Sequence, residues 1–291
     1  MKQVSQPYVL FTSVLSSLPD GIADRICYQL DKAIHYAPVI GLMGKSGAGK
    51  SSLCNTLFSP PPARVDAVNG CTRCVQRYQV SYKSHTLSLI DFPGVGETPG
   101  LDKIYSRLYQ EWAEKLDLII WVLKADERAW NEDIQCYRKL LQAGADPARF
   151  LFVLSQADKI EPCREWKNNR PSERQYKNLM LKTERVESTF RPVHPVVAVS
   201  ASEGYNLHQW VETFIMALPA RASGAVVGRL GTVYRTEKVI GSARERFADA
   251  VGDIFDETIG NILTSQTFST VLLTVRKRLI SLAKSLWHIF F

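Results

Sequence analysis

Short apolar runs and longer helical repeats of apolar residues alternate along most of the chain. Apolar runs too short for helices occupy residues 39–43, 116–122 and 150–154, and residues 75–82, 86–90 and 196–199 also have the pattern of strands. Apolar residues at helical spacing separate several of these runs, notably at 101–115, 128–143 and 207–218. Uniformly apolar strands are typical of parallel sheets that helices cover on both faces. The pattern therefore predicts a three-layer α/β fold with a mostly parallel six-stranded sheet and ligand-binding loops at the carboxyl ends of its strands.

Neither end of the chain continues the α/β pattern. Near the N-terminus, Ile22, Ile26, Leu30 and Ile34 recur at helical spacing after helix breakers at 19–21, which predicts a leading helix. After residue 219 the strand signal stops, and glycines at 224, 228 and 231 indicate a flexible passage before helix-forming sequence. We therefore expect an N-terminal helical extension at 1–36, an α/β domain at 37–218 and a C-terminal helical region at 219–291.

A long apolar repeat marks the last predicted helix. Alternating four- and three-residue steps give one continuous apolar seam: Phe268, Leu272, Val275, Leu279, Leu282, Leu286 and Ile289. The opposite side carries basic and hydroxyl residues: Arg276, Lys277, Arg278, Ser281, Lys284 and Ser285. Such a helix can pack on the leading helix or the α/β domain, pair with a second copy of the chain, or lie on an anionic membrane. Extra apolar residues widen the face and favour packing or membrane contact over a simple dimer: Leu273, Ile280, Trp287, Phe290 and Phe291.

Residues 44–51 read Gly-Lys-Ser-Gly-Ala-Gly-Lys-Ser directly after the first apolar run. The spacing G-x-x-x-x-G-K-[ST] is that of a loop whose backbone N–H groups surround a phosphate, because Gly44 and Gly49 reach backbone angles closed to other residues. Lys50 then reaches the β/γ-phosphate oxygens, Ser51 is placed to bind Mg²⁺, and a helix starting at about Ser51 adds the positive end of its dipole. The predicted phosphate-binding residues are Gly44, Lys45, Ser46, Gly47, Ala48, Gly49, Lys50, Ser51 and Ser52.

Further motifs stand at the ends of later predicted elements. Asp91-Phe92-Pro93-Gly94 ends a strand, where the carboxylate can hold Mg²⁺ through water and the Gly94 N–H can meet a γ-phosphate. Thr72 lies in the loop after the first helix of the α/β domain, where its hydroxyl can complete the metal's ligands. The tetrapeptide Ser-Gln-Ala-Asp at 155–158 follows the fifth predicted strand, and Ser-Ala-Ser at 200–202 follows the sixth.

With these motifs in order over residues 38–218, the chain resembles the translation-factor-related P-loop GTPases and, among them, the Era-like group. The narrower resemblance is to prophage-encoded bacterial Era-like GTPases with helical tails. The resemblance implies GTP or GDP and Mg²⁺ as the bound groups. It also implies that Asp158 accepts hydrogen bonds from guanine and that the backbone near Ala201 faces the guanine carbonyl, with Gln156 and Ser200 beside them.

The resemblance extends to the chemistry of the phosphates. It implies a catalytic set of Lys50, Thr72 and Gly94 at the γ-phosphate. It implies a metal-binding set of Ser51, Thr72 and Asp91.

Three departures from the family pattern change what we expect. The family has Asn-Lys where this chain has Ser155 and Gln156, so a base contact and a stacking stem are lost. At about 0.5–1.5 kcal/mol for each contact, we expect affinity for GTP to fall by roughly tenfold or more. Val95 replaces the glutamine that orients the attacking water in many relatives, which predicts slow hydrolysis. Gly47 replaces the asparagine of potassium-activated members, so the pattern leaves dependence on potassium open.

Composition indicates the size of the fold and the kind of partner, rather than the chemistry of the site. The 291 residues are 45% hydrophobic and 22% charged, which suits one full α/β domain with a smaller element. The formal net charge of +7 fits an anionic partner, either nucleic acid or anionic lipid, as well as a merely solvated basic face. Ribosomal RNA is the less favoured partner, because no recognisable RNA-binding module follows the α/β domain.

Cysteines and apolar stretches bear on the compartment. Six scattered cysteines suit a reducing cytosol better than a disulfide framework. The N-terminus has no apolar core of signal-peptide length, and half of residues 258–275 are Thr, Ser, Asn or Gln, which makes a poor membrane span. We expect a cytoplasmic protein, with peripheral attachment at the inner membrane face as an alternative. Cys71 and Cys74 form a C-x-x-C without further ligands at zinc spacing, which favours plain thiols over a metal or redox site.

Together these features predict a GTP-binding molecular switch with slow Mg²⁺-dependent hydrolysis. The alternative is a structural or membrane-associated module that binds the nucleotide with negligible hydrolysis and acts through its helical tail. A homodimer through that tail is a further possibility.

Overall fold

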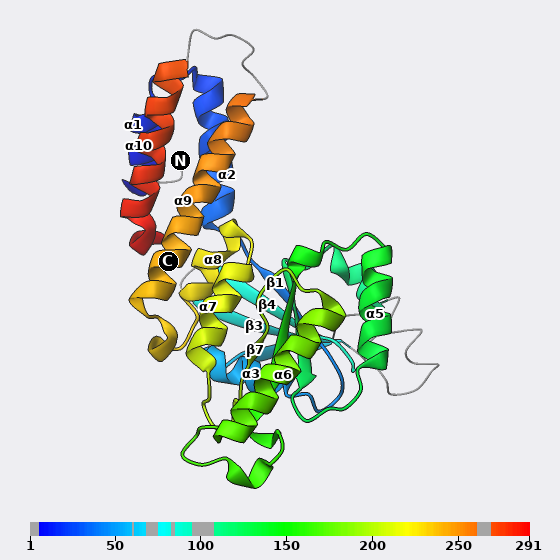
Figure 1. Cartoon of the computed structure of the whole chain (residues 1–291). Coiled ribbons are helices and arrows are strands. Elements are labelled where there is room, and N and C mark those ends of the chain that lie inside the picture. Colours follow the sequence, from blue (N-terminus) through cyan, green and yellow to red (C-terminus); the bar gives the residue numbers. More distant parts are fainter. Residues whose placement is uncertain (1–5, 60, 68–74, 83–84, 95–107, 261–268) are drawn as a thin grey trace.

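A seven-stranded mixed sheet forms the centre of the larger part of the molecule (Figure 1). The computed structural model describes residues 6–59, 61–67, 75–82, 85–94, 108–260 and 269–291. The strands are β1 (Val39–Met43), β2 (Ala63–Ala67), β3 (Gln76–Tyr82), β4 (His85–Asp91), β5 (Leu118–Lys124), β6 (Phe150–Ser155) and β7 (Val197–Ala198). Their order in the sheet is β2-β3-β4-β1-β5-β6-β7. The five strands β4, β1, β5, β6 and β7 are parallel, whereas β2 pairs antiparallel with β3, and β3 with β4.

The predicted fold class is confirmed, but the sheet has one strand more than the six predicted. The additional strand, β2, pairs antiparallel with β3 and carries the sequence Ala-Arg-Val-Asp-Ala. An outer strand is held mainly by backbone hydrogen bonds to one neighbour, so it needs no apolar run. Its mixed sequence therefore gave no strand signal.

Helices cover both faces of the sheet. One face packs against α3 (Lys50–Leu57), α7 (Leu207–Ala217) and α8 (Ala220–Val227). The other packs against α5 (Asn131–Gln142), α6 (Glu173–Phe190) and the helical residues 108–113. Side chains alternate along β5, with Leu118, Ile120 and Val122 in the first layer and Ile119, Trp121 and Leu123 in the second. Short 3₁₀ turns lie at Pro147–Arg149, Ala157–Lys159, Cys163–Glu165 and Thr232–Tyr234.

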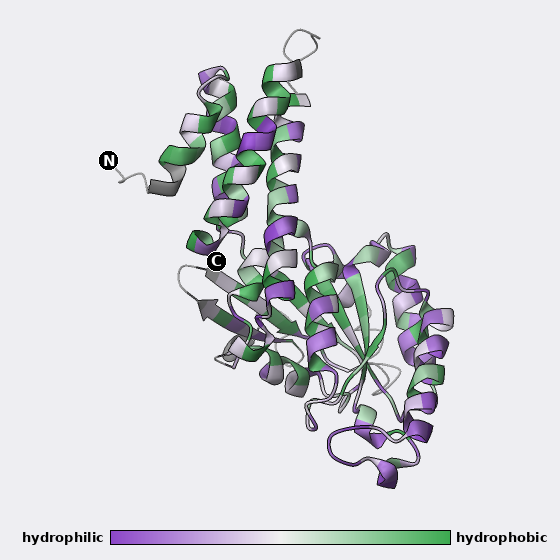
Figure 2. Ribbon diagram, turned by 60° about the vertical axis from the view of Figure 1, so that its left-hand side comes forward, coloured by the Kyte–Doolittle hydropathy of each residue, from purple (hydrophilic) through white to green (hydrophobic). Residues whose placement is uncertain are grey.

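Four helices from the two ends of the chain form a bundle that extends away from the sheet (Figure 1). They are α1 (Gln6–Leu15), α2 (Asp20–Ile34), α9 (Glu237–Gly260) and α10 (Ser269–Phe290). Apolar and polar residues alternate along each of them, as Figure 2 shows. Burial of Ile22, Ile26, Leu30 and Ile34 confirms the predicted apolar face of α2, and α1 is a further helix that the sequence did not signal.

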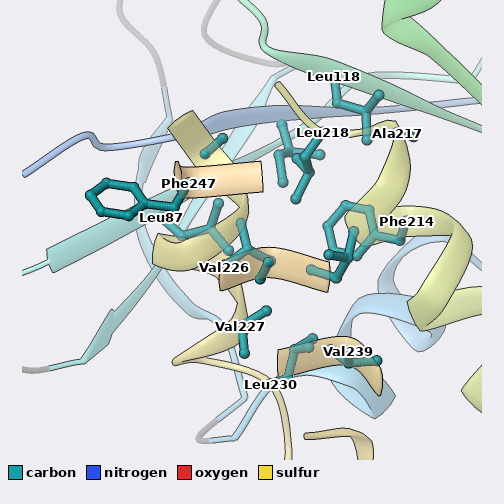
Figure 3. Packing of buried hydrophobic residues seen from close by; sticks show 14 of the residues in the cluster. Leu87, Leu118, Phe214, Ala217, Leu218, Val226, Val227, Leu230, Val239 and Phe247 are labelled. Carbon is teal, nitrogen blue, oxygen red and sulfur yellow. The ribbon is translucent and has the colours of Figure 1, made fainter. Parts of the chain in front are cut away.

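The passage after residue 219 was predicted to be flexible, and that prediction is wrong. Residues 220–227 form α8, whose side chains pack between the sheet and α9 (Figure 3). Gly224 lies so close to the ring of Phe291 that an added Cβ would be 2.7 Å from its Cε2. The glycine therefore permits close packing of α8 on the C-terminus, although it lowers intrinsic helix propensity.

The segment after α8 is hydrogen-bonded to the sheet side of the molecule. Phe58 and Leu230 form an antiparallel bridge, and the Gly231 N–H donates to the Leu57 carbonyl at the end of α3. The guanidinium of buried Arg229 donates through Nε to the Val80 carbonyl of β3 at 2.9 Å. Burial lowers the pKa of Arg229 to about 10. One apolar core continues from the sheet through this segment into the bundle. Because no break in the core separates the two parts among the described residues, the domain boundary at residue 218 stays a prediction.

The last helix packs within the same chain. Its buried residues are Val275, Leu279, Ala283, Leu286, Trp287 and Phe290. Ile289, predicted to lie in the seam, is 48% exposed, because the buried stripe of a helix with 3.6 residues per turn drifts from a strict seven-residue repeat. Two basic residues of α10 pair with α9: Arg276 with Asp256, and Lys284 with Glu245. Among the helices described, none is both long and apolar enough to cross a membrane.

Candidate functional site

The loop between β1 and α3 has the backbone shape that its glycines permit. Gly44, Gly47 and Gly49 all have positive φ, at 127°, 73° and 89°. A Cβ at Gly44 would lie 2.2 Å from the Val122 carbonyl oxygen of the neighbouring strand, so no other residue fits there. These glycines wrap residues 44–49 around the N-terminus of α3, where unpaired helix N–H groups and the helix dipole favour an anion.

Lys50 begins α3 and is 9% exposed. Its Nζ donates to the carbonyl oxygens of Gly44 at 3.1 Å and Lys45 at 3.2 Å. The ammonium group is therefore held inside the loop by backbone carbonyls. A phosphate oxygen entering the loop meets a cation that is already in place.

Ser51 and Asp91 form a pair of oxygen donors beside this lysine. The Ser51 hydroxyl donates to Asp91 Oδ2 at 3.2 Å, and within the described residues the buried Asp91 Oδ1 has no hydrogen-bond partner. Burial raises the pKa of Asp91, whereas the nearby Lys50 charge and the Ser51 hydrogen bond lower it. A hard cation such as Mg²⁺ binds serine and carboxylate oxygens, so the unpartnered Oδ1 fits a metal or a metal-bound water.

Gly94, three residues after Asp91, lies directly against the phosphate loop. A Cβ at Gly94 would be 2.3 Å from the backbone nitrogen of Ser46. Only glycine permits this approach, and it brings the end of the Asp91–Gly94 motif to the mouth of the loop.

The side chain of Lys45 points away from the phosphate loop. Its Nζ lies 2.8 Å from Glu127 Oε1 and 3.0 Å from Glu132 Oε2, beyond the end of β5. Burial disfavours the Lys45 charge, but hydrogen bonds to the two carboxylates prevail and raise its pKa. The predicted phosphate contact of Lys45 is thus left to its backbone.

Two residues at the end of β6 bind the phosphate loop from the other side. The Ser155 hydroxyl lies 2.6 Å from the Ala48 carbonyl oxygen and 3.1 Å from that of Leu123, and its one proton can serve either. The side-chain amide of Gln156 donates through Nε2 to the Gly47 carbonyl at 2.8 Å. The residues that depart from the family's Asn-Lys pair therefore connect β6 to the loop.

Asp158 and Ser200 meet next to these contacts. The Ser200 hydroxyl, which is fully buried, donates to Asp158 Oδ1 at 2.5 Å and accepts from the Glu203 N–H at 3.2 Å. It also lies 3.1 Å from the Ser202 hydroxyl. The two predicted base-reading motifs, 42 residues apart in sequence, are thus joined by one hydrogen bond.

One pocket of about 540 Å³ connects the phosphate loop with the base-reading side. Its lining contains nine of the predicted site residues: Ser46, Gly47, Gly49, Lys50, Ser51, Ser52, Asp91, Gln156 and Ala201. It also contains Leu53, Ser155, Lys159, Val199 and Ser202, which were not predicted as site residues. Lys159 directly follows Asp158, and this adjacency was the only sequence signal for it.

Some predictions fall outside the described residues. These are the metal ligand Thr72, the C-x-x-C of Cys71 and Cys74, Val95 at the expected glutamine position, Phe268 of the C-terminal seam and residues 101–107 of the helical segment predicted at 101–115. Their roles stay predictions.

Comparison with known proteins gives consistent matches. The model of the 50S ribosome-binding GTPase family matches residues 39–156. YfjP of Escherichia coli K12 is 40% identical over 277 residues, covering 95% of this chain and 96% of YfjP. YkfA of the same organism is 36% identical over 281 residues, covering 97% of each chain. The solved structure of Aquifex aeolicus Era with GDP·AlF₄⁻ is 21% identical, with a TM-score of 0.45 over 63% of this chain and 57% of that one.

Proposed function

Because the chain belongs to the Era-like P-loop GTPases, which bind and hydrolyse GTP, we propose that it is a guanine-nucleotide switch with slow, Mg²⁺-dependent hydrolysis. The observation that carries the proposal is the cluster of Lys50, Ser51 and Asp91 in the lining of one pocket, where a buried carboxylate oxygen has no hydrogen-bond partner among the described residues. The cation, the hydroxyl and the carboxylate are the groups that a triphosphate with its metal requires.

Each residue has a distinct task at the phosphates. Lys50 binds β- and γ-phosphate oxygens in exchange for the loop carbonyls that it contacts without ligand. Ser51 and Asp91 hold Mg²⁺, with Thr72 as the further ligand that the resemblance implies. Mg²⁺, when bound, neutralises charge that develops on the phosphate oxygens. The Gly94 N–H, next to Ser46, donates to the γ-phosphate.

Recognition of guanine rests on Asp158. A carboxylate accepts from the ring N–H and exocyclic amine of guanine, and adenine does not present that pair of donors. The hydrogen bond from Ser200 orients one oxygen of Asp158, and we expect the carboxylate to face the base. The backbone at Ala201, in the lining of the same pocket, faces the guanine carbonyl.

Slow hydrolysis follows from residue chemistry at position 95. Valine has no polar side-chain atom, so it cannot orient an attacking water as glutamine does in relatives. We expect turnover to rise when a partner supplies the missing group.

Peripheral attachment to an anionic membrane is the second candidate function, and it concerns the helical bundle. It is favoured by α10, which has no acidic residue and exposes Leu273, and by α1, which has no charged residue and exposes Val9 and Leu10.

A turnover assay tests the proposal directly. GTP hydrolysis is measured under single-turnover conditions with Mg²⁺, with EDTA, and with vesicles that contain anionic or only zwitterionic lipid. We expect slow release of phosphate that EDTA abolishes, and stimulation restricted to anionic vesicles if the membrane candidate holds. Hydrolysis at the same rate in EDTA would contradict the assignment of Ser51 and Asp91. Fast turnover by the protein alone would contradict the role given to Val95.

A further inference from the structure

Gln156 is held in an unusual backbone conformation at the junction of the pocket. Its φ of 54° and ψ of 41° lie in the left-handed region, which a glutamine rarely adopts. A residue stays there only when its surroundings hold it. Hydrogen bonds of the Gln156 side chain hold this conformation, because both the nitrogen and the oxygen of its amide have partners.

The two bonds of this amide join the phosphate loop to Lys159. Nε2 of Gln156 donates to the Gly47 carbonyl at 2.8 Å, and Oε1 accepts from Lys159 Nζ at 2.7 Å. The Lys159 N–H also donates to the Gln156 carbonyl at 2.9 Å, which closes a tight turn between them. Lys159, Gln156 and Gly47 thus form one continuous hydrogen-bonded chain.

These three hydrogen-bonded residues lie along the wall of the nucleotide pocket. Gly47 and Gln156 lie in its lining, as does Lys159, together with Ala201 and Ser202 of the base-reading loop. Among the described lining residues, Lys159 and Lys50 are the only cations, and Lys50 lies at the phosphate end. The Lys159 ammonium is therefore a second lining cation, held by a neighbour that is itself bonded to the phosphate loop.

We propose that Gln156 positions Lys159 as a second cation of the nucleotide pocket, in addition to Lys50. The Gln156 amide provides the bond to the phosphate loop and positions Lys159. Lys159 provides the cation that contacts polar atoms at the base and sugar of the nucleotide. This inference rests on the proposed function, and it adds a nucleotide-binding residue, Lys159, that lies just outside the recognised motif.

A double-mutant cycle tests the pairing through dissociation constants for GTP and GDP. Lys159→Ala should weaken binding of both nucleotides about three- to tenfold, by loss of one charge-assisted contact. In a Gln156→Lys background, the new lysine can reach the Gly47 carbonyl and the nucleotide by itself. There, Lys159→Ala should change affinity less than twofold, which is the signature of a shared task.

Two controls separate the outcomes. Lys177→Ala removes an exposed lysine of α6 outside the pocket lining, and it should leave both affinities unchanged. The melting temperature without nucleotide reports whether Lys159→Ala merely destabilises the fold, and we expect no shift.

Three results would overturn the pairing. They are equal affinities of Lys159→Ala and the wild type, the same loss in both backgrounds, and a loss confined to GTP, which would place Lys159 at the γ-phosphate. Failure of the wild-type protein to bind GTP at all would instead refute the proposed function, so the two failures are distinguishable.

Discussion

The nucleotide pocket and the helical bundle treat their charged groups in opposite ways. In the pocket, a buried oxygen of Asp91 has no hydrogen-bond partner among the described residues, and the Lys50 ammonium donates to the backbone carbonyls of Gly44 and Lys45. On α10, by contrast, Arg276 and Lys284 each form an ion pair with a carboxylate of α9. Apolar residues of α10 such as Leu279 are buried within the chain. The pocket is thus arranged to gain contacts from a ligand, whereas α10 has its contacts within the chain. Substitutions in the two regions should therefore change different quantities, binding in one and folding in the other.

The largest effect is expected at Lys50. Lys50→Ala removes the buried cation of the phosphate loop, and the other lysine of that loop, Lys45, is held by Glu127 and Glu132. Affinity for GTP should fall at least about a hundredfold, since charge-assisted bonds to two phosphate oxygens are lost. Isothermal titration calorimetry measures this, with Lys177→Ala as the matched lysine control. An affinity within a factor of two of wild type would refute the assignment of the phosphate loop.

The converse test lies in the bundle at Leu279, which is fully buried on α10. Leu279→Ala should lower the free energy of unfolding by about 2–5 kcal/mol, through lost burial and a residual cavity. Chemical denaturation measures it, and GTP affinity of the folded variant should stay within twofold. Leu273→Ala, on the same helix but 57% exposed, is the control and should change stability by less than about 0.5 kcal/mol. A large loss of GTP affinity in Leu279→Ala would remove the distinction between the two regions.

Asp133, at the start of α5 near the Lys45 contacts, should make the free energy of unfolding depend on pH. Its side chain is fully buried and accepts from Trp121 Nε1 at 2.8 Å, and burial raises its pKa to about 6. The folded state therefore binds this proton more tightly than the unfolded state does. Stability from this group is complete below the unfolded pKa near 4 and is lost as pH rises through 6, by up to about 3 kcal/mol.

Unfolding free energies between pH 4 and 7 test this sign. Relative to wild type, Asp133→Asn should gain stability as the pH rises through this range, since the amide never ionises. The facing groups Lys45, Glu127 and Glu132 are unchanged in both proteins, so the difference isolates Asp133. A difference that stays constant with pH would show that Asp133 ionises as it does in the unfolded chain.

The smallest effect is expected at the surface of the bundle. Arg276 donates to both carboxylate oxygens of Asp256, at 2.7–2.9 Å, but the two side chains are 33% and 52% exposed. Exposed ion pairs contribute only about 0.2–1 kcal/mol. A double-mutant cycle with Arg276→Ala and Asp256→Ala should give a coupling energy in that range, reduced by added salt. A coupling above about 2 kcal/mol would mean that the pair, rather than apolar burial, holds α10.

Local signals made the phosphate loop and the sheet predictable. The spacing of Gly44, Gly49 and Lys50 was enough to recognise the loop, because its positive-φ glycines lie within a few residues of one another. Apolar runs gave the strands that are covered on both faces, and missed β2, which is held at the edge by pairing.

Contacts between distant segments were not predictable in this way. The helix at 220–227 depends on Gly224 meeting Phe291, 67 residues later, and local propensity argues against it. Lys45 turns toward carboxylates that are 82 and 87 residues away, which no spacing rule reveals. Gln156 looked like a lost contact in the sequence because its partner in the phosphate loop, Gly47, lies 109 residues away along the chain.

The most direct test of the central claim, that this pocket holds a guanine nucleotide through Asp158, is displacement of fluorescent GDP. We expect unlabelled GTP to displace it at equimolar concentration, and ATP to fail at a hundredfold excess. In Asp158→Asn, affinity for GTP should fall and xanthosine triphosphate should become the better competitor, because its C2 carbonyl accepts from the new amide. Displacement by ATP and GTP at equal concentrations would contradict the account.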